Sequence, residues 1–497
     1  MSMEFEDIAD TRTPDAAACR DIYLMGICGT GMAALAGLLK EKGYNVQGSD
    51  SQAYPPMGDL LKGLGIPVYL GYGEKNLSSR PDLVIIGNVI RRDNPEAEYV
   101  LRKGIPYMSF PQALSHFFLH DRTPLVVSGT HGKTTTSSLL VSVLMSVGED
   151  PGFMIGGVVS AFGSGFRLGS RPWFVLEGDE YDTAFFDKRP KFVHYRPKAA
   201  ILTSIEFDHA DIYPDLDAVK AAFTRLVEII PEDGLLVACA DWPAIRDILG
   251  HARCRVITYG ETEDADYMLM SHKTLSSGTE FNFISKDKTP LKALVPLPGR
   301  HNAINALGAA ALLIEFGFAN KTVLDGLESF QGVKRRQEIR GIEAGVTVID
   351  DFAHHPTAVK ETLAALREKY HGRRLIAVFE PRTNTSRRAV FQNAYPGALV
   401  NADMVLVRET PDLEKAPPGD RFSSKRLTED LKDLGVDAEC LPDAASIARA
   451  LCKICKDRDV VVIMSNGAFE NLHERLLTGL RKGAGPARAL SAEAAGE

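Results

Sequence analysis

The stretch Gly129-Thr130-His131-Gly132-Lys133-Thr134-Thr135-Thr136 lies between an apolar strand pattern, residues 124–127, and a helical pattern that runs from Lys133 to about Val147. A loop of this kind points its backbone N–H groups at phosphate oxygens and adds a helix N-terminus, a lysine charge and a hydroxyl for Mg²⁺. It therefore predicts a nucleoside triphosphate site. The usual spacing places a glycine at position 127, where this chain has Val127, so a glycine-rich turn with an incidental lysine is the alternative.

Length and composition narrow the class of protein. A chain of 497 residues is too long for one ordinary core, and this length predicts about three domains. A hydrophobic content of 45% and a formal net charge of -8 are typical of a soluble protein and argue against nucleic-acid binding. The acidic first twenty residues do not form a signal-peptide pattern, and no apolar run is long enough for membrane insertion. With seven scattered cysteines, these features predict a cytoplasmic protein.

Alternating strand and helix patterns predict an α/β fold with three domains. Residues 21–121 open with a β-α-β unit and should form a Rossmann-like domain. Residues 122–332 surround the phosphate loop and are expected to form a central domain with a mixed sheet. Residues 333–480 again alternate strands with helices, which predicts a second Rossmann-like domain. The ends, 1–20 and 481–497, are expected to be flexible.

A second glycine-rich turn, Gly26-Ile27-Cys28-Gly29-Thr30-Gly31, lies between the first predicted strand and the first predicted helix. Asp50 ends the next strand, as in a dinucleotide-binding fingerprint. Cys28 stands where the second glycine of that fingerprint belongs, which weakens the case for NAD but still allows a diphosphate site. A tight turn of an ordinary α/β domain is the alternative.

Polar clusters follow two strands of the predicted central domain. Residues 177–182 come directly after the strand pattern 173–176, and residues 203–211 end the next strand. Mg²⁺ takes few protein ligands and completes its octahedron with phosphate oxygens and water. The pattern therefore predicts a magnesium site formed by Thr134, Glu177 and His209, with acidic solvated loops as the alternative.

Further polar residues stand at helix and strand ends later in the chain. Asn302, at the start of an apolar helix, would either cap that helix or read an adenine edge. In the third domain, residues 350–356 and 380–385 close two successive strands, where open α/β sheets bind ligands. The pair His354-His355 suggests zinc, but adjacent histidines on a loop diverge and no third ligand stands at helix spacing, so we do not expect a zinc site.

Taken in order, these elements resemble the Mur ligase family of peptidoglycan enzymes, which are ATP-dependent amide-bond ligases with three domains. The resemblance covers residues 21 to 480. The first turn, together with Gly48-Ser49-Asp50, is similar to the UDP-binding start of the UDP-N-acetylmuramate ligases. Residues 181–189 and 380–385 resemble the members that attach the murein tripeptide L-alanyl-γ-D-glutamyl-meso-diaminopimelate, rather than L-alanine, to UDP-N-acetylmuramate.

The resemblance implies a reaction and its participants. ATP and Mg²⁺ would be the cofactors, and UDP-N-acetylmuramate and the tripeptide the small-molecule substrates, in peptidoglycan recycling. The lactyl carboxylate would take the γ-phosphoryl group of ATP, and the peptide amine would then displace phosphate. The alternatives are the L-alanine-adding ligase of de novo synthesis, a nucleotide-gated binding protein without ligase activity, and an NAD-linked dehydrogenase.

The resemblance also implies roles for individual residues. Catalysis would fall to Lys133, His209 and Glu177. ATP would be bound by Gly129, Thr130, His131, Gly132, Lys133, Thr134, Thr135, His301, Asn302, Arg336 and Asp351. The UDP-sugar would be bound by Gly26, Cys28, Gly29, Thr30, Gly31, Met32, Asp50 and Asn88, and the peptide by His355, Arg382, Asn384 and Asn466. Several relatives carry a carbamylated lysine in the helix after His209, but this register holds Phe223 or Thr224 there, so no carbamate is expected.

Overall fold

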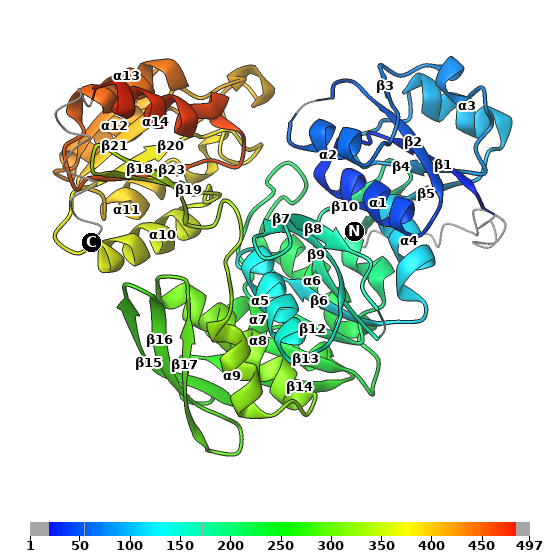
Figure 1. Ribbon diagram of the computed structural model, residues 1–497, viewed down its shortest axis with the longest axis horizontal. Helices are drawn as coiled ribbons and strands as arrows, with labels where there is room; N and C mark the ends of the chain where they lie inside the picture. The colour runs from blue at the N-terminus through cyan, green and yellow to red at the C-terminus, as the bar shows by residue number, and fades with distance from the viewer. Residues whose placement is uncertain (1–18, 54, 171, 484–497) are drawn as a thin grey trace, which may run out of the picture.

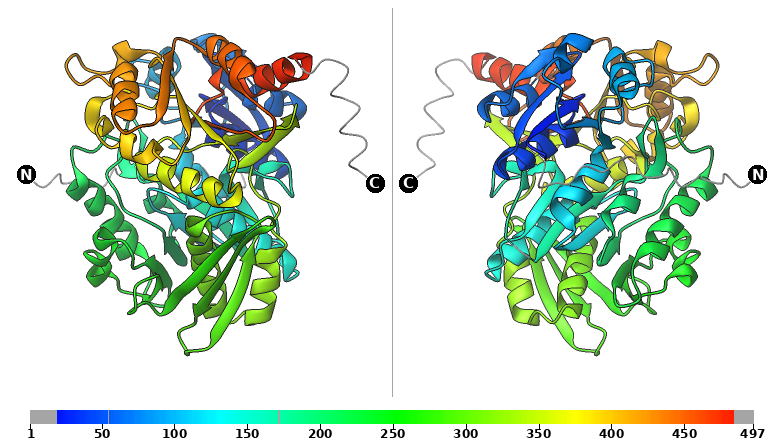
Figure 2. Two further views of the ribbon diagram at one scale, coloured as in Figure 1. Left: turned by 90° about the vertical axis from the view of Figure 1, so that its left-hand side faces the viewer. Right: turned by 90° about the vertical axis from the view of Figure 1, so that its right-hand side faces the viewer.

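The computed structural model describes residues 19–53, 55–170 and 172–483, and it has three α/β domains, each built on its own sheet (Figure 1). Figure 2 shows that the N-terminal and C-terminal domains lie at the same end of the central domain. Of the ends predicted to be flexible, only residues 19–20 and 481–483 are described, and 481–483 belong to a helix. No helix of the described ranges is long and apolar enough to cross a membrane.

The N-terminal domain has a five-stranded parallel sheet in the order β3-β2-β1-β4-β5. Its strands are β1 (Asp21–Met25), β2 (Asn45–Asp50), β3 (Val68–Leu70), β4 (Leu83–Ile86) and β5 (Tyr107–Ser109), and its helices are α1 (Thr30–Glu41), α2 (Met57–Gly63), α3 (Pro95–Lys103) and α4 (Phe110–Leu114). Because β2 and β4 lie on opposite sides of β1, the strand order reverses at the carboxyl end of β1. Open α/β sheets bind ligands at such a point, and residues 26–31 lie there.

The central domain has a ten-stranded sheet in the order β17-β16-β15-β14-β13-β12-β6-β9-β7-β8. The strands from β15 to β7 in that order pair in parallel, and the sheet is antiparallel at both ends, so the predicted mixed sheet is confirmed. The strands are β6 (Thr123–Ser128), β7 (Gly152–Val159), β8 (Ser164–Arg167), β9 (Trp173–Gly178), β12 (Ala199–Leu202), β13 (Leu235–Cys239), β14 (Arg255–Gly260), β15 (Tyr267–Leu275), β16 (Gly278–Ile284) and β17 (Pro290–Val295).

Helices and a small hairpin complete the central domain. The helices are α5 (Lys133–Ser146), α6 (Leu216–Ile229), α7 (Pro243–Arg246), α8 (Arg300–Glu315) and α9 (Asn320–Glu328). Apolar residues of α5 and α8 lie in one buried core with the sheet, and the two helices pack against each other. The hairpin β10 (Asp182–Ala184) and β11 (Asp187–Pro190) reaches the N-terminal domain, where Phe186 contacts Tyr107 with ring centroids 5.0 Å apart.

The C-terminal domain has a six-stranded sheet in the order β18-β19-β23-β20-β21-β22, parallel except for β18. Its strands are β18 (Glu338–Glu343), β19 (Val346–Asp351), β20 (Leu375–Phe379), β21 (Met404–Arg408), β22 (Asp437–Leu441) and β23 (Val460–Met464). One core packs α10 (Pro356–Lys369), α11 (Tyr395–Leu399) and α12 (Ser424–Asp433) on one face, and another packs α13 (Ala444–Ile454) and α14 (Leu472–Gly483) on the other. Helices on both faces give the predicted doubly wound arrangement.

Candidate active site

The phosphate loop connects the buried strand β6 to helix α5. Gly132, at the N-cap of α5, has φ +80°, and a Cβ there would lie 2.5 Å from Asn305 Oδ1, so glycine is required. The amides of Thr130 and His131 donate to Ser204, at 3.0 Å to its carbonyl and 2.8 Å to its hydroxyl. No side chain caps α5. The amides of its first turn, rather than all amides of the loop, therefore offer the anion site.

Lys133 is the buried cation of this loop. Its Nζ donates to Gly129 O at 2.6 Å and to Glu180 Oε2 at 3.2 Å. Burial would lower the pKa of Lys133, but the carboxylates of Glu180, Asp179 and Glu177 outweigh it and raise that pKa. The ammonium group is therefore charged and aimed at the loop.

Glu180 contacts both Lys133 and His209, a role that its place in the acidic stretch 177–182 did not indicate. Its Oε1 lies 3.2 Å from His209 Nε2, and its side chain is 2% exposed. Burial would raise the pKa of Glu180, but Lys133 and His209 hold it below the ordinary value. Burial would likewise lower the pKa of His209, but the hydrogen bond to Glu180 raises it to about 9. His209 is thus held as a cation, and its binding to a metal would first require loss of that proton.

Glu177, near the end of β9, has different surroundings from Glu180. It accepts a hydrogen bond from Gly156 N at 2.9 Å, and burial raises its pKa. The charge of Arg336 offsets part of this rise in the pKa of Glu177. Arg336 Nη2 also donates to Thr134 Oγ1 at 2.9 Å. Thr134 and Glu177 therefore both interact with one guanidinium, and they supply the hydroxyl and carboxylate oxygens that suit Mg²⁺.

Residues predicted to contact adenine or ribose lie on α8 and beside β19. Asn302 does not cap α8, which corrects one of its two predicted roles, because Gly299 is the N-cap and Asn302 lies inside the first turn. Its Nδ2 donates to Pro298 O at 2.8 Å and to Gln337 Oε1 at 3.3 Å. Asp351 accepts the amides of Gln337 and Ala353, each at 2.8 Å. Asp351 therefore fixes the backbone that carries Arg336 to the site.

The first glycine-rich turn is held by a carboxylate rather than by a cation. Cys28 N donates to Asp50 Oδ2 at 2.9 Å, and Ser51 N donates to Asp50 Oδ1 at 2.7 Å. The Cys28 side chain is buried. Of the residues predicted to bind the UDP-sugar, Thr30, Gly31 and Asn88 line the cavity described below, and Asp50 shapes the turn behind them.

Residues predicted to bind the peptide lie at the ends of the C-terminal strands. Arg382 lies against Gly467, where a Cβ would come 1.4 Å from its Nη1. Among the described residues Arg382 forms no hydrogen bond or ion pair, so its guanidinium is available to a ligand. Asn384 Nδ2 donates to Asp211 Oδ2 of the central domain at 2.7 Å. His354 and His355 diverge as predicted, since one contacts Phe352 O and the other Phe207 O.

One cavity of about 2140 Å³ joins these groups. It is lined by residues of all three domains, among them Thr30, Gly31, Asn88, Lys133, Thr134, Glu177, His209, His301, Asn302, Arg336, Asp351, His355, Arg382, Asn384 and Asn466. Pockets for one small ligand usually measure about 300–1,000 Å³. The cavity is therefore large enough for several ligands together.

Family models match nearly the whole chain. The Mur ligase family catalytic domain matches residues 21–122, the Mur ligase middle domain residues 127–313, and the Mur ligase glutamate ligase domain residues 335–467. The chain belongs to the Mur ligase family, as the sequence motifs predicted. It is 41% identical to the UDP-N-acetylmuramate--L-alanyl-gamma-D-glutamyl-meso-2,6-diaminoheptandioate ligase of Escherichia coli K12, over 93% of this chain and 98% of the relative.

Two further comparisons bear on the subgroup. The UDP-N-acetylmuramate--L-alanine ligase of Syntrophomonas wolfei is 32% identical, over 92% of this chain and 96% of the relative. The solved murein peptide ligase of Psychrobacter arcticus superposes with a TM-score of 0.71 at 36% identity, covering 93% of this chain and 98% of that one. The similarity to both kinds of ligase thus covers more than nine-tenths of the chain.

Proposed function

We propose that this protein is an ATP-dependent ligase that joins L-alanyl-γ-D-glutamyl-meso-diaminopimelate to the lactyl carboxylate of UDP-N-acetylmuramate. The observation that carries the proposal is the single cavity that brings the phosphate loop, the Gly26–Gly31 turn and the unpaired Arg382 together. The curated relative with 41% identity supplies the substrate class through its name. We place the reaction in the cytoplasm, in peptidoglycan recycling.

A carboxylate must be activated before an amine can displace one of its oxygens. In the proposed reaction the lactyl carboxylate attacks the γ-phosphorus of ATP, which forms an acyl phosphate and releases ADP. The peptide amine then adds to the acyl carbon, and inorganic phosphate leaves as the amide forms. Each of the two steps has a good leaving group, ADP in the first and phosphate in the second, whereas direct attack of the amine on the carboxylate would have a poor one.

Lys133 would stabilise the first of these steps. Charge on the transferring phosphoryl group spreads over its equatorial oxygens, and a buried ammonium beside them lowers the barrier more than it strengthens ground-state binding. Thr134 and Glu177 would hold Mg²⁺, with His209 as a further ligand once deprotonated. The metal would neutralise phosphate charge. Glu180 keeps Lys133 charged and in place.

The third domain would recognise the tripeptide, which carries several carboxylates. A guanidinium binds a carboxylate through two parallel hydrogen bonds, and the guanidinium of Arg382 lines the cavity without a hydrogen bond or ion pair to any residue that the structure describes. Asn466, His355 and Asn384 also line the cavity. Contacts between the domains, such as that of Asn384 with Asp211, would exclude water from the cavity until the amine reacts with the acyl phosphate.

The test offers the purified protein ATP, Mg²⁺ and UDP-N-acetylmuramate with either the tripeptide or L-alanine, and measures ADP release and the amide product by mass spectrometry. We expect both signals only with the tripeptide. Product with L-alanine alone would assign the alanine-adding reaction instead. ADP release without any amide would favour a nucleotide-gated binding protein. With ¹⁸O in the lactyl carboxyl group, one labelled oxygen should appear in the released phosphate.

Replacing Arg382 by lysine tests the peptide site. Lysine keeps the charge but cannot form the paired hydrogen bonds, so KM for the tripeptide should rise about tenfold or more, with KM for UDP-N-acetylmuramate unchanged. Arg426→Lys is the matched control, because Arg426 is exposed on α12, where its guanidinium bonds Asn393 and forms an ion pair with Asp430. Equal effects on both KM values would remove Arg382 from the peptide site.

A further inference from the structure

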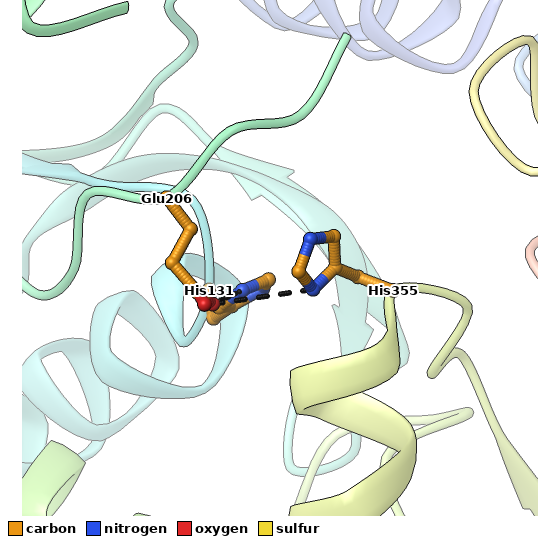
Figure 3. A group of neighbouring side chains, drawn as sticks. All are labelled: His131, Glu206 and His355. Atoms are coloured by element: carbon orange, nitrogen blue, oxygen red, sulfur yellow. Dashed lines mark hydrogen bonds and ion pairs between the residues drawn. The ribbon is translucent and has the colours of Figure 1, made fainter. Parts of the chain in front are cut away.

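Three side chains capable of binding a metal meet at the junction of the central and C-terminal domains (Figure 3). His131 lies in the phosphate loop, Glu206 lies in the segment after β12, and His355 directly precedes α10. One ligand atom from each residue lies within 4.8 Å of the other two. His131 Nε2 is 2.6 Å from Glu206 Oε2, and His355 Nδ1 is 3.9 Å from the same oxygen.

The hydrogen bonds of His355 turn one of its ring nitrogens toward the cluster. His355 Nε2 faces Phe207 O at 3.2 Å, and a hydrogen bond there leaves the Nδ1 lone pair toward the cluster.

The hydrogen bond between His131 Nε2 and Glu206 Oε2, at 2.6 Å, would be lost if a metal bound both atoms. Two further hydrogen bonds involve Thr357. Thr357 N donates to His355 Nδ1 at 3.2 Å, and Thr357 Oγ1 donates to Glu206 Oε1 at 3.0 Å. The first bond would be lost on metal binding, whereas the second uses the other carboxylate oxygen and would remain. Tetrahedral zinc with bonds of about 2.0–2.1 Å separates its ligand atoms by about 3.3 Å. The present separations lie on both sides of that value, so small side-chain rotations would suffice.

We propose that His131, Glu206 and His355 form a binding site for a divalent transition-metal ion, with zinc as the fitting ion, separate from the magnesium site at Thr134 and Glu177. Two imidazoles and one carboxylate are the ligands of several zinc sites that leave a fourth position open. Two imidazole nitrogens in one site favour zinc over Mg²⁺, which takes mostly oxygen ligands. His131 and His355 also line the large cavity, so the fourth position would face it.

A metal here would join the phosphate loop to the C-terminal domain. Glu206 and His131 belong to the central domain, and His355 is the N-cap of helix α10 in the C-terminal domain. Binding would therefore hold the two domains in their present arrangement and restrict the loop that receives phosphate. This inference does not depend on which peptide the enzyme uses.

The experiment uses the intact chain after chelator treatment, in millimolar Mg²⁺, and titrates it with Co²⁺ and Zn²⁺. Visible absorption of bound Co²⁺ reports coordination, and equilibrium dialysis reports Zn²⁺ affinity. We expect one ion bound through nitrogen and oxygen ligands. Affinity should fall more than about tenfold in both Glu206→Gln and His355→Gln. The control is His251→Gln, because His251 is an exposed histidine beside Glu228, and it should bind as the wild type does.

Several outcomes would overturn the proposal. Unchanged affinity in either ligand variant would do so, as would sulfur-to-metal charge transfer in the cobalt spectrum, which would place the ion on cysteines. Circular dichroism checks that the variants fold. If either variant does not fold, zinc-edge X-ray absorption of the wild-type protein decides: two imidazoles with oxygen support the site, and any other ligand set refutes it.

Discussion

Two glycine-rich turns in this molecule each connect a strand to a helix, but the side chains around the two turns differ. Residues 26–31 join β1 to α1, and residues 129–132 join β6 to α5, each at the carboxyl end of a buried parallel strand. The first turn is fixed by Asp50, which accepts the amide of Cys28. The second carries Lys133, which is surrounded by the carboxylates at the end of β9.

This difference shows that the neighbouring strand ends, rather than the glycines, decide what such a turn does. Both turns offer main-chain amides near a helix N-terminus, which is enough to bind phosphate. Only the second has a buried cation that a further carboxylate, Glu180, holds in place. We therefore expect the first turn to bind a diphosphate and the second to transfer a phosphoryl group.

The largest expected effect follows from removing the cation of the second turn. Lys133→Ala should lower kcat by about 10³-fold, because the charge that develops on the phosphoryl group loses its nearest ammonium. UDP-N-acetylmuramate binding, measured by calorimetry, should stay nearly the same. Lys220→Ala is the control, because Lys220 lies on α6 in ion pairs with Asp217 and Asp247. Activity within a few-fold of wild type would contradict the catalytic role of Lys133.

A smaller effect is expected from the carboxylate that positions the cation. Glu180→Gln keeps the size of the side chain and removes its charge, so kcat should fall about 10²-fold. Glu180 raises the pKa values of Lys133 and His209, the latter to about 9, so its loss should lower both. The alkaline limb of the pH–rate profile, on which Lys133 loses its charge, should then move to lower pH. A lower kcat with an unmoved alkaline limb would mean that Glu180 acts through packing alone.

The sequence predicted the parallel strands better than the antiparallel ones. The buried strands β4, β20 and β23 are continuous apolar runs, and such runs identify strands that are covered on both faces. Strands β15 to β17 were not predicted, since β15 exposes polar residues along much of its length. Their pairing depends on partners from elsewhere in the chain.

Some residues of the candidate site could likewise be predicted from the sequence and others could not. The phosphate loop could be located because its residues are consecutive in the sequence. The partner of Lys133 could not be chosen among Glu177, Asp179 and Glu180, since that choice depends on how the chain turns after β9. The cluster of His131, Glu206 and His355 was not foreseen, because its members are far apart in sequence and lie in two domains.

A third test acts on the first turn and should give the opposite kinetic result. Asp50→Asn places an amide where Cys28 N and Ser51 N now donate to a carboxylate, which weakens the turn. KM for UDP-N-acetylmuramate should rise about tenfold, since one hydrogen bond to a charged group contributes about 1.5–3 kcal/mol, and kcat should change little. A loss of kcat as large as that of Glu180→Gln would mean that both turns serve the chemical step.

The smallest expected effect concerns Cys28, which stands where a dinucleotide-binding turn has glycine. Burial, reinforced by the charge of Asp50, raises the pKa of the Cys28 thiol to about 11. At pH 8 only about one part in 10³ would be thiolate, and the side chain is 1% exposed, so alkylation should be very slow.

Cys452, which is exposed on α13, should react first, and mass spectrometry of peptides alkylated for increasing times measures the order. Because the thiol packs inward, it would not contact a diphosphate bound at this turn, and UDP-N-acetylmuramate should not alter the slow rate. Rapid labelling of Cys28 that the UDP-sugar prevents would mean that the thiol itself lies in the binding site, and that the two turns differ more than their shared backbone suggests.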